Sequence, residues 1–185
     1  MKIDIGKALA NKLYCESAFR HYVKIGVLRK TGNSLFEKHM NKAVSNLDFA
    51  NFLMEEHKFS IKDKLPGRTF YDWCITIYYY SIYLTALALT AKIGYESKSH
   101  LATIIAITLF YYHRDNLLKK EDVEFIISSV HLDRKDIDLV IDAKDMRERA
   151  SYNVDSSFEL GQARMAQVQT ADFVSRIRVL LEEVR

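Results

Sequence analysis

Two short polar segments of the sequence carry the side chains best suited to chemistry. In the first, Arg147 and Arg149 are followed closely by Tyr152. A helix through this segment places Arg149 and Tyr152 on one side and Arg147 beside Ser151. The planar arginine side chain suits a phosphate group, and a tyrosine ring can stack on an unpaired base. The alternative is a structural role, in which Arg147 forms a buried ion pair and Tyr152 packs in the core.

The second polar segment contains Lys98 and His100, and it follows a long uncharged stretch that ends near Gly94. We expect Ser97 or Ser99 to cap a helix here, which places Lys98 and His100 at its first turn. The free backbone N–H groups of a helix N-terminus favour an anion and a neutral imidazole. A neutral His100 that faces a substrate is suited to act as a general base. The alternative is that this pair only ties the turn to neighbouring helices.

Other common catalytic and binding patterns are missing from the sequence. The six histidines pair with no other histidine, cysteine or carboxylate at a recognised ligand spacing, so we expect no metal and no cofactor. Glycine-rich phosphate loops are absent as well. The formal net charge of +3 is too small to indicate nucleic-acid binding by overall charge, so such binding depends on a local cluster. Cys15 and Cys74 fit no metal spacing and suggest reduced thiols in a cytoplasmic protein.

Apolar periodicity predicts long helices along much of the chain. One proline and six glycines in 185 residues leave few positions that interrupt a helix. Apolar residues recur every three or four positions from Ser34 to about His57 and again near the C-terminus. Both helices open with a predicted capping box, Ser34 with Glu37 and Ser156 with Glu159. The first stripe contains Phe36, Met40, Ala43, Leu47, Ala50 and Met54, and the last contains Ala163, Ala166, Thr170, Phe173, Ile177, Leu181 and Val184.

A central helix is predicted between Thr69 and Gly94. The nineteen residues from Trp73 to Ala91 include no charged residue, and this uncharged stretch is long enough to span a membrane. We favour the central helix of a bundle and no membrane association, because the tyrosines among residues 78–83 would lie at the middle of the bilayer, whereas tyrosine prefers its interface. These tyrosines are expected to form core or interface, with a stacking platform for bases as the alternative.

The complete pattern predicts an all-α fold, an antiparallel up-and-down bundle of about five helices. Residues 1–34 form a short helical extension, and residues 35–185 form the bundle. No alternating pattern of apolar and polar residues competes with the helices. The remaining predicted segments are loops at Arg29–Ser34 and His57–Arg68 and helices at Leu101–Leu118, Glu121–His131 and Arg134–Tyr152.

With these segments in place, the chain resembles small prokaryotic proteins of the HEPN-domain family over about Leu35 to Val184. The resemblance rests on the striped helix that begins LFEKHMNKA and on the tyrosine-rich helix that leads through Gly94 to Lys98–His100. It rests most strongly on Arg147 followed by Ala-Ser-Tyr152 before a final amphipathic helix. In similar proteins this segment usually reads Arg-x-x-Ala-Asp-Tyr, so the serine is a departure.

The resemblance implies a bundle that commonly forms a homodimer. Many members are metal-independent endoribonucleases, and many are toxins paired with a minimal nucleotidyltransferase antitoxin. Their catalytic arginine is followed four to six residues later by histidine, whereas residues 148–155 contain none. We therefore expect a HEPN-like interaction module associated with RNA or nucleotide through Lys98, Arg147 and Arg149. The alternative is an endoribonuclease that uses Arg147 with Tyr152 or His100.

Overall fold

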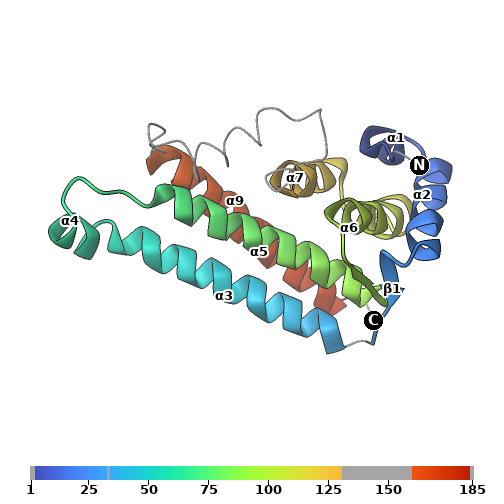
Figure 1. The fold of residues 1–185 in the computed structure, drawn as a ribbon, viewed down its shortest axis with the longest axis horizontal. Coiled ribbons are helices and arrows are strands. Elements are labelled where there is room, and N and C mark those ends of the chain that lie inside the picture. Colours follow the sequence, from blue (N-terminus) through green and yellow to red (C-terminus); the bar gives the residue numbers. More distant parts are fainter. Residues whose placement is uncertain (1–2, 33, 131–159, 184–185) are drawn as a thin grey trace.

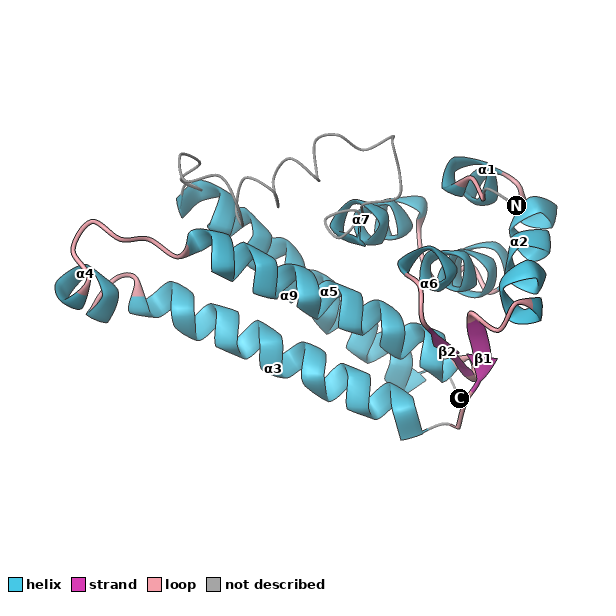
Figure 2. Ribbon diagram, in the orientation of Figure 1, coloured by secondary structure: helices cyan, strands magenta, loops and turns pink. Residues whose placement is uncertain are grey.

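The computed structural model describes residues 3–32, 34–130 and 160–183. Helices dominate these ranges, and the strands within them form one two-stranded sheet (Figure 1, Figure 2). This arrangement confirms the predicted all-α class. The predicted helix at 134–152 and the capping box at 156–159 lie outside the described residues. The elements are α1 (Ile5–Ala10), α2 (Lys12–Lys24), β1 (Leu28–Lys30), α3 (Ser34–Glu56), α4 (Ser60–Lys64), α5 (Tyr71–Lys92), β2 (Tyr95–Ser97), α6 (His100–Ile107), the π-helix η1 (Thr108–Arg114), α7 (Lys120–Val130) and α9 (Leu160–Glu183).

Three long helices, α3, α5 and α9, form the elongated body of the molecule, and α9 passes behind α5 in Figure 1. Their apolar stripes face one another, so that Met40, Ile82 and Phe173 belong to one buried cluster. Each large apolar side chain that is fully buried contributes about 1.5–3 kcal/mol to folding. Most positions of the predicted stripes are buried: Met40, Ala43, Ala50 and Met54 on α3, and Ala163, Thr170, Phe173, Ile177 and Leu181 on α9. Phe36, Leu47 and Ala166 are half-buried, and Val184 lies outside the described residues.

The uncharged helix α5 lies at the centre of this body. It is the one described helix that is long and apolar enough to span a membrane, and 61% of its most apolar window is buried within the protein. It packs against α3, α9, α6 and α7. Its polar groups find partners inside, because the Ser81 hydroxyl donates to the Ala43 carbonyl at 2.7 Å and the Thr85 hydroxyl to the Ser81 carbonyl at 2.9 Å. This position agrees with the predicted central helix of a bundle.

The two ends of α5 differ in how well the sequence predicted them. The helix begins at Tyr71 and not at Thr69. The N–H of the preceding Phe70 donates to Nε2 of His57 at 2.8 Å, so the histidine ring satisfies a backbone group near the helix start. The other end is as predicted, because Gly94 has a φ of +79° and follows the last residues of the helix. The predicted loop between α3 and α5 contains the short helix α4, which has no buried residue.

A second group of elements, which we name the α2/α6 region, comprises α1, α2, the sheet, α6 and η1. It has a buried cluster of its own. Within it, the ring centroid of Phe19 lies 5.2 Å from that of Tyr95 and 5.3 Å from that of Phe110, in edge-to-face arrangements. Helices α1 and α2 thus pack on α6, and α2 also packs on η1. The division of the chain at residue 34 stays a prediction.

Two predictions within the α2/α6 region are wrong. Arg29 and Lys30 do not lie in a loop but in β1, which pairs antiparallel with β2. A three-residue strand shows no periodicity, and its partner lies far along the chain, so the sequence pattern gave no signal. The predicted helix Leu101–Leu118 becomes α6 followed by a π-helix that ends at Arg114. In this wider turn the buried Tyr111 hydroxyl donates to the Leu89 carbonyl at 3.0 Å.

Candidate functional site

The polar segment with Lys98 and His100 lies where β2 leads into α6. The Lys98 N–H donates to the Val27 carbonyl at 3.2 Å and extends the pairing of the two strands. Ser99 has an extended backbone and is the N-cap residue of α6. It is one of the two serines, Ser97 and Ser99, that the sequence predicted for this position. Its carbonyl accepts from the Thr103 N–H at 2.9 Å and from the Thr103 hydroxyl at 3.0 Å. This local geometry makes His100 the first residue of α6.

His100 stacks on a tyrosine of the central helix. The ring centroids of Tyr83 and His100 lie 4.1 Å apart with an angle of 31° between the rings. Both side chains are half-buried. The tyrosines of residues 78–83 therefore divide, because Tyr78 and Tyr79 are core, Tyr80 is exposed, and the half-buried Tyr83 contacts His100. The aromatic pair joins two elements at one surface.

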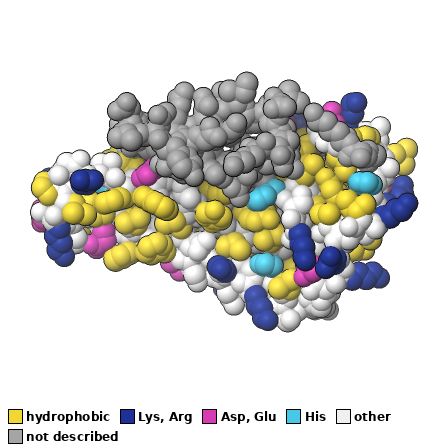
Figure 3. Space-filling model, viewed as in Figure 1, with side chains coloured by type: hydrophobic (Ala, Val, Ile, Leu, Met, Phe, Trp, Pro, Cys, Tyr) yellow, Lys and Arg dark blue, Asp and Glu magenta, His cyan; other side chains and the backbone are white. Residues whose placement is uncertain are grey.

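Two exposed cations belong to the sheet or follow it directly. In the strand register Arg29 is opposite Glu96, and Lys98 follows two residues later on the same side. Arg29 and Lys98 are exposed, and the Arg29 Nε donates to the Gly26 carbonyl at 2.8 Å. Figure 3 shows basic side chains gathered over this end of the molecule. We define the Lys98–His100 site as Arg29, Tyr83, Lys98 and His100, which are two cations and two rings in contact, with Glu96 opposite Arg29.

The sequence predicted only part of this group. Lys98 and His100 were predicted, and Tyr83 was noted within a tyrosine cluster whose role stayed open. Arg29 was missed, because only the pairing of β1 with β2 brings it to Glu96 and Lys98. The predicted residues Arg147, Arg149 and Tyr152 lie outside the described residues.

Two other histidines have structural partners. His57 Nδ1 lies 2.7 Å from the Leu53 carbonyl, and Nε2 accepts from the Phe70 N–H. These two bonds require a neutral ring with its proton on Nδ1. The Nε2 atom of His113 lies 2.8 Å from the Ala8 carbonyl and ties η1 to α1. These contacts make both side chains supports of the fold.

The described residues contain no candidate metal-binding cluster and no reactive thiol. No group of three His, Cys, Asp or Glu side chains there could hold a metal ion. Cys15 and Cys74 are fully buried. Burial raises the pKa of each thiol to about 12, which leaves both as thiols at neutral pH. The chemistry available to the described site is therefore anion attraction, ring stacking and proton transfer by histidine.

Large aromatic side chains are exposed on both α3 and α5. We name this group the α3/α5 aromatic face, and it consists of Phe49, Phe52, Trp73 and Tyr80, which are 44–59% exposed. Phe49 and Phe52 are three residues apart on α3, and Trp73 and Tyr80 are seven apart on α5, so each pair shares one side of its helix. Figure 3 shows hydrophobic side chains running over both helices on this face. Such a surface is typical of a protein interface.

Comparisons with known proteins supply no family for this chain. No protein-family model matches it, and no curated protein matches its sequence.

Proposed function

We propose that this chain is a HEPN-like interaction module that associates with single-stranded RNA or nucleotides through the Lys98–His100 site. The observation that carries this proposal is the Tyr83–His100 ring pair at the start of α6, which follows the exposed Lys98 by two residues, together with the exposed Arg29 on the paired strand β1. Cations attract phosphate groups, and aromatic rings stack on unpaired bases without regard to sequence. By its resemblance to the family, the segment with Arg147 would add a further phosphate contact.

The position of His100 motivates a second candidate function, a metal-independent endoribonuclease. Its ring is held at the first residue of α6 by Tyr83, where it could exchange a proton with a ribose hydroxyl. Such an enzyme would use Arg147 together with His100 or Tyr152. The binding role has the stronger support, because Tyr152 stands where similar ribonucleases carry histidine.

The test is binding and cleavage of a labelled single-stranded RNA pool in the presence of EDTA. The wild type should bind without cleaving, and Lys98→Ala should weaken binding and lower the slope of log affinity against log salt by about one unit. Lys62→Ala is the matched control, since Lys62 is an exposed lysine on α4 at the other end of the body. Absence of binding at low salt would refute the proposal. Cleavage by the wild type that Arg147→Ala abolishes would establish the endoribonuclease instead.

The same module is proposed to form a homodimer through the α3/α5 aromatic face. Large exposed aromatic side chains are the usual anchors of such contacts. Light scattering during gel filtration should give a dimer for the wild type and a monomer for the double variant Phe49→Ser, Trp73→Ser. Leu13→Ser, which alters an exposed apolar residue of α2, is the control and should stay dimeric.

The family resemblance also suggests a protein partner, a minimal nucleotidyltransferase encoded beside this chain. Co-expression with such a neighbouring gene product should yield a complex that survives gel filtration. Separate elution of the two proteins would remove this part of the proposal and leave the RNA-associated role untouched.

A further inference from the structure

Positive charge is concentrated in the first thirty residues of the chain. They contain seven lysines and arginines against two acidic residues, a formal charge of +5, whereas the remaining residues contain 20 against 22, a formal charge of −2. The small net charge of +3 therefore conceals a strongly basic segment. Figure 3 shows lysine and arginine side chains over the end of the molecule at which Figure 1 places α2. A surface of this kind attracts polyanions.

The cations on the outer side of α2 are available to a ligand. Arg20 and Lys24 are exposed and lie one helical turn apart, with Cβ atoms about 5–6 Å from each other. Within the described ranges no carboxylate forms an ion pair with either of them. The two acidic side chains of the segment are engaged elsewhere, because Asp4 caps α1 and Glu16 pairs with Arg114 at 3.4 Å.

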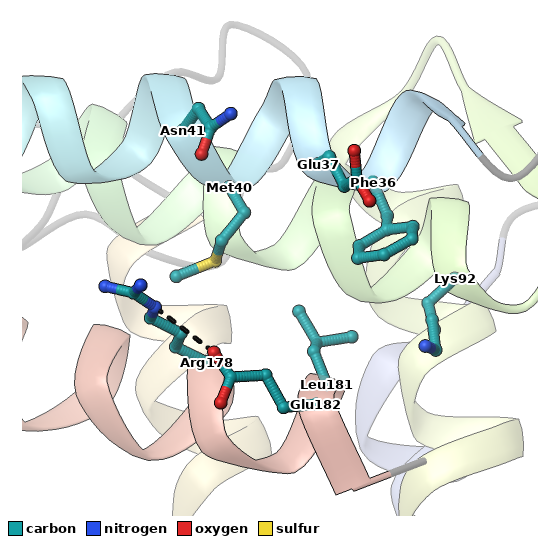
Figure 4. Close-up of a pocket in the computed structure, with 8 residues that line it drawn as sticks. All are labelled: Phe36, Glu37, Met40, Asn41, Lys92, Arg178, Leu181 and Glu182. Atoms are coloured by element: carbon teal, nitrogen blue, oxygen red, sulfur yellow. Dashed lines mark ion pairs between the residues drawn. The ribbon is translucent and has the colours of Figure 1, made fainter. Parts of the chain in front are cut away.

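The cleft between α3 and α9 shows the opposite balance of charge (Figure 4). It has a volume of about 460 Å³ and is lined by two cations, Lys92 and Arg178, and by two carboxylates, Glu37 and Glu182. The Arg178 Nε pairs with Glu182 at 3.4 Å. Formal charges thus cancel in this cleft, whereas those on the outer side of α2 do not.

The backbone joins the end of α2 to the cations of the Lys98–His100 site. Helix α2 ends at Lys24. Two residues later, the Gly26 carbonyl accepts from the Arg29 Nε at 2.8 Å. The carbonyl of the next residue, Val27, accepts from the Lys98 N–H at 3.2 Å. The cations of α2 therefore lead directly into the site at which Tyr83 contacts His100.

The C-terminus of α2 opposes an anion, but the charges at this end outweigh it. A helix C-terminus carries a partial negative charge equivalent to about half an elementary charge. Three carbonyls of its last turn accept from backbone N–H groups that follow the helix. Lys24, Arg29 and Lys98 supply three full positive charges at this end and in the adjoining sheet, against one carboxylate, Glu96. The balance stays positive.

We propose that the ligand of the Lys98–His100 site is a nucleic-acid strand and not a free nucleotide, and that its backbone continues from this site along the outer side of α2, past Lys24 and Arg20. This inference rests on the proposed RNA-associated function and chooses between its two classes of ligand. A free nucleotide leaves the cations of α2 without a partner, whereas successive phosphates of a strand contact them in turn. Cations that follow the backbone, together with rings that stack on bases, are typical of single-strand binding.

An anionic lipid surface is the competing partner. Three aliphatic side chains of this region, Leu13, Val23 and Ile25, are 75%, 38% and 54% exposed. A helix that lies in the membrane interface inserts its apolar face, however, and that face of α2 is buried in the protein's own core. Lipid headgroups also offer no base on which Tyr83 and His100 could stack. The combination of charge and rings therefore favours the strand.

The experiment measures fluorescence anisotropy of two labelled oligouridylates, a trinucleotide and a dodecanucleotide, with the full chain in the presence of EDTA. The dodecanucleotide should bind the wild type more tightly. The double variant Arg20→Gln, Lys24→Gln should weaken it about tenfold and lower the slope of log affinity against log salt by about 1.4 units, since each phosphate contact of a single strand contributes about 0.7. The trinucleotide should bind this variant and the wild type equally.

Two further variants are matched controls. Lys62→Gln, Lys64→Gln removes the same charge from exposed positions of α4, at the other end of the body, and should leave both affinities unchanged. Arg20→Lys, Lys24→Arg keeps both charges and should bind the dodecanucleotide as the wild type does. The length dependence of the wild type tests the proposal even if the neutral α2 variant folds poorly.

The outcomes separate this proposal from the function on which it rests. Equal affinity of the wild type for both oligonucleotides, or a loss in the α2 variant no larger than in the α4 control, would overturn the strand path. Binding that Lys98→Ala weakens would then still support the proposed function. Dependence on Arg20 and Lys24 but not on Lys98 would refute the Lys98–His100 site and with it the continuous path. Binding to phosphatidylserine vesicles, with neither oligonucleotide bound, would assign the cations of α2 to a membrane and overturn the proposal.

Discussion

The body of α3, α5 and α9 and the α2/α6 region reach a packed core by different routes. The body joins three helices of more than twenty residues through continuous apolar stripes. The α2/α6 region wraps short elements around α6, in which every residue from Leu101 to Ile107 is buried. Polar contacts then fix these elements, among them His113 to the Ala8 carbonyl and the Asp4 N–H to the Tyr14 hydroxyl at 3.0 Å.

This difference indicates which contacts stabilise each region. Long helices gain most of their stability by burying one face, and they form wherever that face finds a partner. Short helices and three-residue strands are unstable alone and depend on every tertiary contact that they make. We therefore expect the α2/α6 region to open more readily than the body.

The largest expected effect comes from a ring at the centre of the body. Phe173 is fully buried on α9, and its ring centroid lies 5.3 Å from that of Phe125. Phe173→Ala should lower the free energy of unfolding by about 3–5 kcal/mol, because it removes a large apolar side chain and leaves a cavity. Urea denaturation followed by circular dichroism measures this change. The control Val168→Ala, at a largely exposed position of the same helix, should change stability by less than about 0.5 kcal/mol. Similar losses in both variants would contradict the dependence on buried stripes.

A smaller effect is expected at the polar link that joins the three helices of the body. Asn51 Oδ1 accepts from the buried Tyr78 hydroxyl at 2.8 Å and from Gln167 at 2.9 Å. Asn51→Ala should cost about 2 kcal/mol, because the Tyr78 hydroxyl loses its acceptor inside the core. Adding Tyr78→Phe should recover part of this loss, and a double-mutant cycle in urea measures the coupling. Strictly additive losses would show that the hydrogen bond contributes nothing.

The two cysteines allow the two regions to be compared directly. Cys15 belongs to the α2/α6 region and Cys74 to the body, and burial raises the pKa of each to about 12. Each thiol should react with iodoacetamide at pH 8 only when its region opens. In single-cysteine variants, Cys15 should react faster than Cys74, about tenfold for each 1.4 kcal/mol of difference in opening free energy. Equal rates for both thiols would mean that the regions open as one unit.

The smallest effect is a pH dependence confined to the body. Burial and, secondarily, Lys42 lower the pKa of His39 on α3 below its usual 6.5. Since the folded state disfavours the charged ring, this contribution to stability is complete above pH 6.5 and is lost as pH falls below it. Thermal unfolding between pH 7 and 5 should show a weaker decline for His39→Gln than for the wild type. Matching pH profiles would exclude His39 as a source of the decline.

The candidate site was harder to predict than the fold. Lys98 and His100 stand out because they follow a helix end and a capping serine in the sequence. Their surroundings do not stand out, since Tyr83 reaches His100 from another helix and strand pairing places Arg29 opposite Glu96, two residues before Lys98.

The sequence by itself determined the all-α class, the stripes of α3 and α9, and the end of α5 at Gly94. These features follow from local rules, namely the helical period of 3.6 residues and the freedom of glycine at positive φ. Only the tertiary structure decided the β1–β2 sheet and the contact of Tyr83 with His100. Each of these joins residues that are distant in the chain, and such contacts depend on how the elements pack and not on any local pattern.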